Sequence, residues 1–120
     1  GGERSRVMLA IKKIMAENND LPTLILDEID TGVSGRIAEE MGKLMQEMSQ
    51  DLQLIVITHL AQVAAKGNEN YKVVKFDENA VTKTTIVKLS DAEKLNEIAQ
   101  LISGSKITEA AISQAKELIG

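Results

Sequence analysis

The sequence predicts an α/β fold built on parallel strands. Two short apolar runs without polar alternation, at residues 23–26 and 54–58, are typical of strands buried on both faces of a parallel sheet. A segment with helical periodicity lies between them and no hairpin turn does, so a right-handed crossover should join two parallel strands. The 120-residue chain suits one domain, residues 1–120, rather than two independent cores.

Helices are expected on both sides of the first strand. Apolar residues at helical spacing predict one from about residue 4 to 17, carrying Val7, Ile11, Ile14 and Met15. A second helix should follow the first strand, with Ser34 or Thr31 as its N-cap. Its expected apolar stripe is Ile37, Met41, Leu44 and Met48.

The second half of the chain predicts a short helix, a hairpin and two further helices. The short helix should run through Ala65, and strands at 71–76 and 82–89, joined by 77–80, should pair as an edge hairpin. The segment Ser90–Glu93 has capping-box spacing. The helix that it opens should stop at Gly104. Residues expected to face the core of the last two helices are Leu95, Ile98, Ile102, Ile112, Ala115 and Ile119.

Composition excludes several classes of function. No apolar run approaches the roughly 20 residues that cross a bilayer, so no membrane role is predicted. Cysteine is absent, which excludes disulfides and thiolate zinc sites and favours an intracellular location. The net charge of −4, the lack of clustered bases and the presence of only Tyr71 and Phe76 as aromatics argue against direct nucleic-acid binding by these residues.

Two adjacent acids end the first apolar strand. Asp27 and Glu28 lie where ligands bind in parallel α/β sheets, at the carboxyl edge. In phosphoryl-transfer sites the first acid of such a pair helps to hold Mg²⁺ and the second polarises the attacking water. A pair of acids capping the following turn is an equal alternative for this short motif alone.

Two more motifs have both functional and structural interpretations. Gly1-Gly2-Glu3 leads into a helix and offers backbone N–H groups to a phosphate, although a cloning remnant or a flexible start has the same pattern. His59 follows the second strand, where a histidine is more often a hydrogen-bonded structural residue than a catalytic one.

Together, these motifs occur in the order of the ATP-binding-cassette family. The segments 1–10, 26–35 and 58–65, and the later 107–111, resemble the RecN family within it. The resemblance implies the C-terminal lobe of a P-loop-NTPase-like ATPase head, with parallel strands, flanking helices and an edge hairpin. Other heads of the structural-maintenance-of-chromosomes (SMC) class rank behind.

The resemblance also implies roles for single residues. Asp27 would support Mg²⁺, Glu28 would act on the lytic water and His59 would contact the γ-phosphate of ATP. The signature-loop residues Gly1, Gly2 and Glu3 would reach the ATP of the opposite subunit, and the loop containing Thr31, Gly32 and Ser34 would face that partner head. Many family members have aspartate where Ser34 stands, and the resemblance leads us to expect proline where Ala61 stands.

The phosphate loop Gly-x-x-x-x-Gly-Lys-Ser/Thr is missing from these residues. We therefore expect a fragment that is inactive alone, with an exposed apolar edge and face. The implied parent is a bacterial cytoplasmic, nucleoid-associated ATPase of double-strand-break repair and recombination, which dimerises with a second copy of its head and contacts DNA through the full-length protein. A non-catalytic head dimerisation or assembly module is one alternative, and a phosphoacceptor or nucleotide-binding regulator is another.

Overall fold

The computed structural model describes residue 11 and residues 22–27 and 35–120. The predicted first helix lies outside these residues except for Ile11, which is buried. The expected N-caps of the second helix, Thr31 and Ser34, also lie outside them. The described elements follow the predicted order: β1 (Thr23–Asp27), α2 (Gly35–Met48), β2 (Gln53–Ile57), α3 (Ala61–Ala64), β3 (Tyr71–Glu78), β4 (Val81–Lys88), α4 (Asp91–Ser103) and α5 (Glu109–Ile119).

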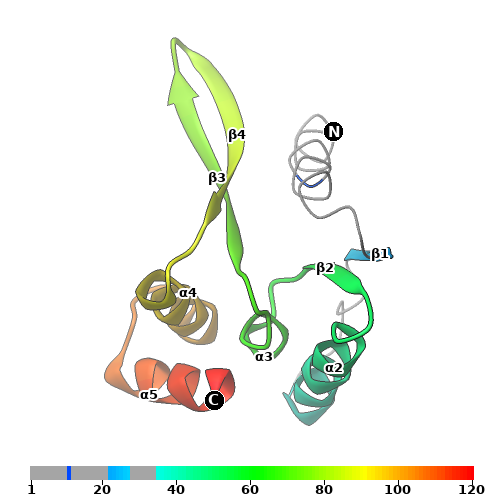
Figure 1. Ribbon diagram of the computed structural model, residues 1–120. Helices are drawn as coiled ribbons and strands as arrows, with labels where there is room; N and C mark the ends of the chain where they lie inside the picture. The colour runs from blue at the N-terminus through cyan, green and yellow to red at the C-terminus, as the bar shows by residue number, and fades with distance from the viewer. Residues whose placement is uncertain (1–10, 12–21, 28–34) are drawn as a thin grey trace.

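The strands β1 and β2 pair in parallel, which confirms the predicted parallel pairing (Figure 1). Their register runs from Thr23 opposite Gln53 to Asp27 opposite Ile57, and the Thr23 hydroxyl donates a hydrogen bond of 2.8 Å to Oε1 of Gln53. The expected burial on both faces is wrong for these strands. Most of their residues are half-buried and Leu24 is 39% exposed, because only one neighbouring strand pairs with each of them among the described residues.

Helix α2 turns a different face inward from the one that the sequence predicted. Of the expected apolar stripe, Ile37 and Leu44 are 63% and 58% exposed. The buried residues are instead Ala38, Gly42 and Met45. Two of these three are the small residues alanine and glycine, which allow a neighbouring helix to approach the backbone closely, and α2 contacts α3.

Helices α3, α4 and α5 share a small core rich in alanine. Its buried members are Ala61, Ala65, Ile98, Ala99, Ala111 and Ala115, and the predicted residues Leu95, Ile102, Ile112 and Ile119 pack against them. The predicted helix end at Gly104 is confirmed, since this glycine has φ +84° and its N–H bonds to the carbonyl of Gln100. Thr108 caps α5 by accepting a hydrogen bond from the N–H of Ala111 at 3.0 Å. The predicted inward faces of both helices are therefore confirmed.

Strands β3 and β4 form the predicted antiparallel hairpin, which projects away from the helices (Figure 1). The hairpin is a sheet of its own and does not extend the β1–β2 pair. Its strands are also longer on the loop side than predicted, because only Asn79 and Ala80 join them. Both residues have positive φ, 52° and 62°, as a tight two-residue hairpin turn requires. The predicted four-residue connection was therefore wrong.

The turn predicts a stabilising substitution. A positive φ costs an L-residue with a Cβ roughly 1–2 kcal/mol, and glycine avoids that cost. We expect Ala80→Gly to stabilise the hairpin by about 1 kcal/mol, which would slow hydrogen exchange of its paired amides about fivefold. The matched change Ala110→Gly, at an exposed position in α5, should instead destabilise its helix by up to about 1 kcal/mol. Faster exchange in the Ala80→Gly hairpin would contradict this account of the turn.

A complete capping box opens α4, as the sequence predicted. The Glu93 N–H donates to the Ser90 hydroxyl at 3.2 Å, and the Ser90 N–H donates to the Glu93 carboxylate at 2.9 Å. The hydrogen bond from the Ser90 backbone, followed by that from its side chain, lowers the pKa of Glu93. The carboxylate form of Glu93 is therefore favoured in the folded chain.

The lowered pKa of Glu93 determines how the stability of the fold changes with pH. A carboxyl group whose pKa is lower in the folded state stabilises the fold above its unfolded pKa, and that contribution is lost as pH falls through the folded value. We expect Glu93→Gln to be less stable than the parent chain at pH 7. The difference should shrink as pH falls below the ordinary glutamate pKa of about 4.3 and vanish below the lower pKa of the folded state. Urea unfolding of both proteins at several pH values measures this. A difference that persists unchanged to the lowest pH would show that the charge of Glu93 plays no part.

Candidate functional site

The candidate site lies at the carboxyl ends of the two parallel strands. β1 ends at Asp27, which is half-buried and lies opposite Ile57, the last residue of β2. The chain continues from Ile57 through Thr58 to His59, whose side chain is exposed. Parallel strands end at the same edge of a sheet. Asp27, the last residue of β1, and His59, two residues after the end of β2, therefore both lie near that edge, as the sequence predicted.

A short hydrogen-bonded turn holds the backbone around His59. The Leu60 N–H donates to the Thr58 hydroxyl at 3.0 Å, so the bond spans the histidine. The Leu60 carbonyl accepts from the N–H groups of Val63 and Ala64, at 3.2 and 2.9 Å, and so begins α3. The backbone of His59 is thereby fixed between β2 on one side and α3 on the other.

The other predicted site residues lie outside the described residues. They are Gly1, Gly2, Glu3, Glu28, Thr31, Gly32 and Ser34. Glu28 directly follows Asp27 in the chain, and the loop containing Thr31 and Ser34 connects β1 to α2. Their roles stay predictions.

The chemistry of Asp27 fits a magnesium ion bound together with phosphates. Proteins usually hold Mg²⁺ through one or two carboxylates, while waters and substrate phosphates fill its other positions. Asp27 offers one carboxylate at the edge where α/β folds bind ligands. Within residues 22–27 and 35–120, no three His, Asp or Glu side chains come together as a complete protein metal cage.

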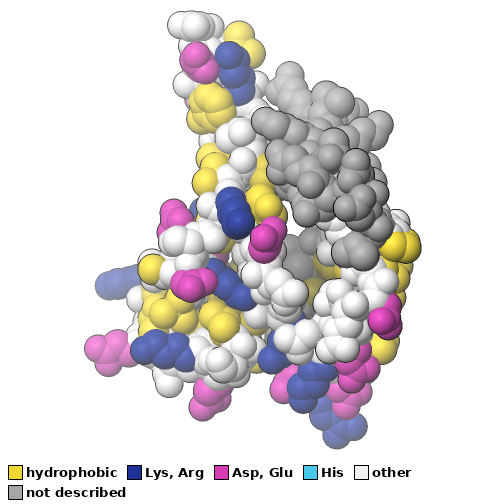
Figure 2. Space-filling view, in the orientation of Figure 1, with side chains coloured by type: hydrophobic (Ala, Val, Ile, Leu, Met, Phe, Trp, Pro, Cys, Tyr) yellow, Lys and Arg dark blue, Asp and Glu magenta, His cyan; other side chains and the backbone are white. Residues whose placement is uncertain are grey.

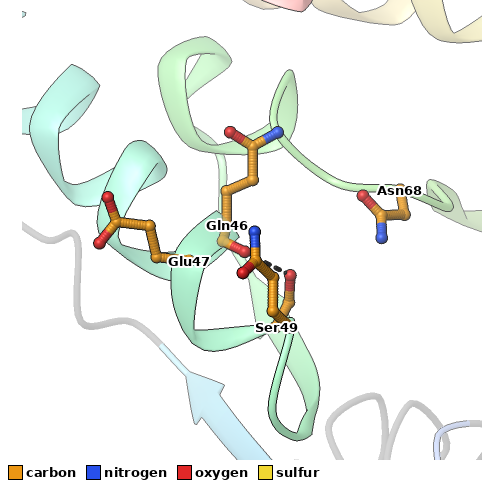
Figure 3. A pocket seen from close by; sticks show the side chains of 5 residues that line it. Gln46, Glu47, Ser49 and Asn68 are labelled. Atoms are coloured by element: carbon orange, nitrogen blue, oxygen red, sulfur yellow. Dashed lines mark hydrogen bonds between the residues drawn. The ribbon is translucent and has the colours of Figure 1, made fainter.

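A shallow polar hollow of about 290 Å³ lies elsewhere (Figure 3). Gln46, Glu47, Ser49, Gln50 and Asn68 line it, and the Ser49 hydroxyl donates a 2.7 Å hydrogen bond to the Gln46 carbonyl. The hollow lies at the end of α2, where the chain is about to enter β2. It therefore lies toward the amino end of β2, away from the edge that carries Asp27 and His59.

On the face shown in Figure 2, the charged side chains are mixed rather than sorted by sign. Three lysines of the hairpin form ion pairs with glutamates. The distances from the lysine Nζ to the glutamate carboxylate oxygen are 2.6 Å for Lys72 and Glu97, 3.3 Å for Lys83 and Glu78, and 3.4 Å for Lys88 and Glu69. These pairs neutralise bases on the hairpin that would otherwise attract phosphate. No helix in the described part of the chain is long and apolar enough to cross a membrane.

Sequence reasoning missed two residues that organise this region. The Thr58 hydroxyl holds the turn around His59, and Gly42 lies buried where α2 meets α3. A glycine inside a helical pattern was the available signal for Gly42, since such a residue often marks a close approach. No comparable signal identified Thr58 as the hydrogen-bond acceptor of the turn.

No protein-family model matches the chain. Its sequence is, however, similar to proteins named DNA repair protein RecN. It is 42% identical over 119 residues to those of Haemophilus influenzae, Vibrio cholerae and Bacillus subtilis, and each match covers 99% of this chain. The same matches cover 21%, 22% and 21% of the three relatives, so the chain spans about a fifth of their length.

The fold is similar to a solved structure from a study of ATP-driven dimerisation and DNA-stimulated activation of SMC ATPases. The TM-score is 0.53 with 22% identity, and the match covers 85% of this chain and 61% of that one. At this level of identity the match shows the fold alone. The resemblance predicted from the motifs is thus confirmed: over 99% of its length this chain has a RecN-like sequence, and its fold is similar to part of that solved structure.

Proposed function

We propose that this chain is the C-terminal lobe of a RecN-like ATPase head and supplies half of its nucleotide site. The observation that carries the proposal is the parallel pairing of β1 and β2. This pairing puts Asp27 at the carboxyl edge of the two strands and lets His59 follow directly after that edge. The similarity in fold to a structure from a study of ATP-driven dimerisation of SMC ATPases supports the choice of ATP as the substrate. On this proposal residues 1–120 form one lobe that is inactive by itself.

Three residues would serve the ATP of their own subunit. Asp27 would hold Mg²⁺, which when bound neutralises charge on the phosphates. Glu28 would accept a proton from the attacking water. His59, fixed in its turn, would donate a hydrogen bond to the γ-phosphate.

A second copy of the head would complete the site. Gly1, Gly2 and Glu3 would reach the γ-phosphate held by the partner, and the loop containing Thr31, Gly32 and Ser34 would lie against the partner head. Backbone N–H groups at the start of a helix suit such an anion. Because Ser34 is uncharged, its contact across the dimer would be a hydrogen bond rather than an ion pair.

The proposed parent acts in double-strand-break repair by recombination in the bacterial cytoplasm, at the nucleoid. The curated relatives are named as DNA repair proteins, and the solved relative comes from a study of DNA-stimulated SMC ATPases. The paired lysines of the hairpin favour DNA contact through other parts of the full-length protein.

Replacing the proposed base tests the ATPase directly. In the full-length parent, Glu28→Gln should lower steady-state ATP turnover about 10²-fold or more and leave ATP binding intact, because only proton acceptance is lost. Glu47→Gln is the matched control, since this exposed glutamate lies at the hollow far along α2. Unchanged turnover in Glu28→Gln would favour the alternative of a non-catalytic dimerisation or assembly module.

Asp27 should show a different dependence from Glu28. Asp27→Asn removes the charge proposed to hold the metal, so we expect the Mg²⁺ concentration for half-maximal turnover to rise about tenfold or more. Titrating Mg²⁺ at saturating ATP in the parent protein measures this. Asp51→Asn, an exposed change just before β2, should leave the Mg²⁺ dependence as it was. The same Mg²⁺ curve for Asp27→Asn and the unmodified protein would remove Asp27 from the metal site.

A further inference from the structure

Helices α2 and α3 meet at a point where only glycine fits. Gly42 is buried, and a Cβ added to it would lie 2.6 Å from the main-chain oxygen of Gln62 and 3.3 Å from Cγ of Lys66. The nearest atom belongs to the backbone, so a side chain at this position requires α3 to move. Glycine inside a helix is less stable than alanine, and the close approach of the two helices explains its presence here.

The opposite side of α3 is also held. Ala61 and Ala65 are buried against α4 and α5, in the cluster that contains Ile98 and Ala99. The amide of Asn70 donates to the Ala64 carbonyl at 2.8 Å, and the Lys94 ammonium donates to the Gly67 carbonyl at 2.8 Å. α3 therefore lies clamped between α2 and the pair α4–α5, and its position depends on both contacts.

The position of α3 directly determines the position of His59. Only Leu60 separates the histidine from the first residue of the helix. The Leu60 carbonyl bonds into α3 and its N–H bonds back to Thr58, so the turn cannot shift independently of the helix. A displacement of α3 by a few tenths of an ångström would reach the imidazole through this one residue.

We infer that Gly42 is a positioning residue for His59. By admitting the main chain of α3 against α2, Gly42 sets the place of α3, and the Thr58–Leu60 turn then sets the histidine at the edge of the sheet. Helix α2, which follows β1 in the chain, thus fixes the position of His59, which follows β2. The consequence for catalysis rests on the proposed ATPase function, whereas the positioning itself does not.

The only histidine of the chain gives a direct readout of the positioning. In the 120-residue chain, the carbon-bound imidazole protons of His59 form a single set of NMR signals. Gly42→Ala should shift these signals while the chain stays folded, since one added methyl group displaces α3 without removing its other contacts. Leu44→Ala, at a 58% exposed position of the same helix α2, is the control and should leave the signals in place. Unshifted His59 signals in folded Gly42→Ala would overturn the inference.

A second pair of variants covers the case in which Gly42→Ala does not fold. Thr58→Val removes the acceptor that closes the turn, whereas Thr58→Ser keeps it, and neither changes the contact between α2 and α3. The His59 signals should shift in Thr58→Val and stay close to their original places in Thr58→Ser. Equal signals in both variants would show that the turn does not transmit the position of α3, which would also overturn the inference.

Turnover of the full-length parent separates the positioning from the proposed function. Gly42→Ala should lower kcat about tenfold with KM changed less than about twofold, because a misplaced group loses transition-state contacts. In a His59→Ala background Gly42→Ala should have no further effect, since it acts through that histidine. An additive loss would overturn the inference. Normal turnover in His59→Ala alone would instead remove His59 from the proposed mechanism, and the NMR result would still decide the positioning.

Discussion

The parallel pairing of β1 and β2 is the constraint from which the candidate site follows. Because the two strands run in the same direction, the residues that end them lie at one edge, although Asp27 and His59 are distant in the sequence. Reversing either strand would place the two side chains at opposite edges. The crossover through α2 imposes this direction, so the strand pairing and the helix between the strands act as one unit.

The second requirement is a firm support for α3. A helix of four residues has no stability of its own in water, because the cost of nucleation exceeds what a single turn returns. Its stability comes from Ala61 and Ala65, which pack into the alanine-rich core with α4 and α5. Small side chains allow these helices to approach closely, and close packing limits their movement. The last two helices, which carry no predicted site residue, thereby support the turn that holds His59.

The chain leaves apolar surface uncovered. Leu24 on β1 and both Ile37 and Leu44 on α2 are more than a third exposed, and the hairpin exposes Val73 and Phe76. This agrees with the sequence-based expectation of an exposed apolar surface. The chain spans about a fifth of the length of its RecN relatives.

The sequence by itself determined the features that depend on near neighbours in the chain. The apolar strands, the acids that follow the first of them, the capping box at Ser90 and Glu93 and the stop at Gly104 are each encoded within a few residues. The strand order and the edge shared by Asp27 and His59 followed from these signals, because parallel strands joined by a helix leave little choice of topology.

Only the tertiary structure decided which surfaces meet. The periodicity of α2 permitted an inward stripe through Ile37 and Leu44, but the buried face contains Gly42, because the close approach to α3 selects small residues. The turn at Ala80 was predicted as part of a longer connection for a related reason, since pairing of the flanking strands holds this alanine at a φ that its local preference disfavours. Such choices depend on partners distant in the chain, and helical or strand periodicity does not encode them.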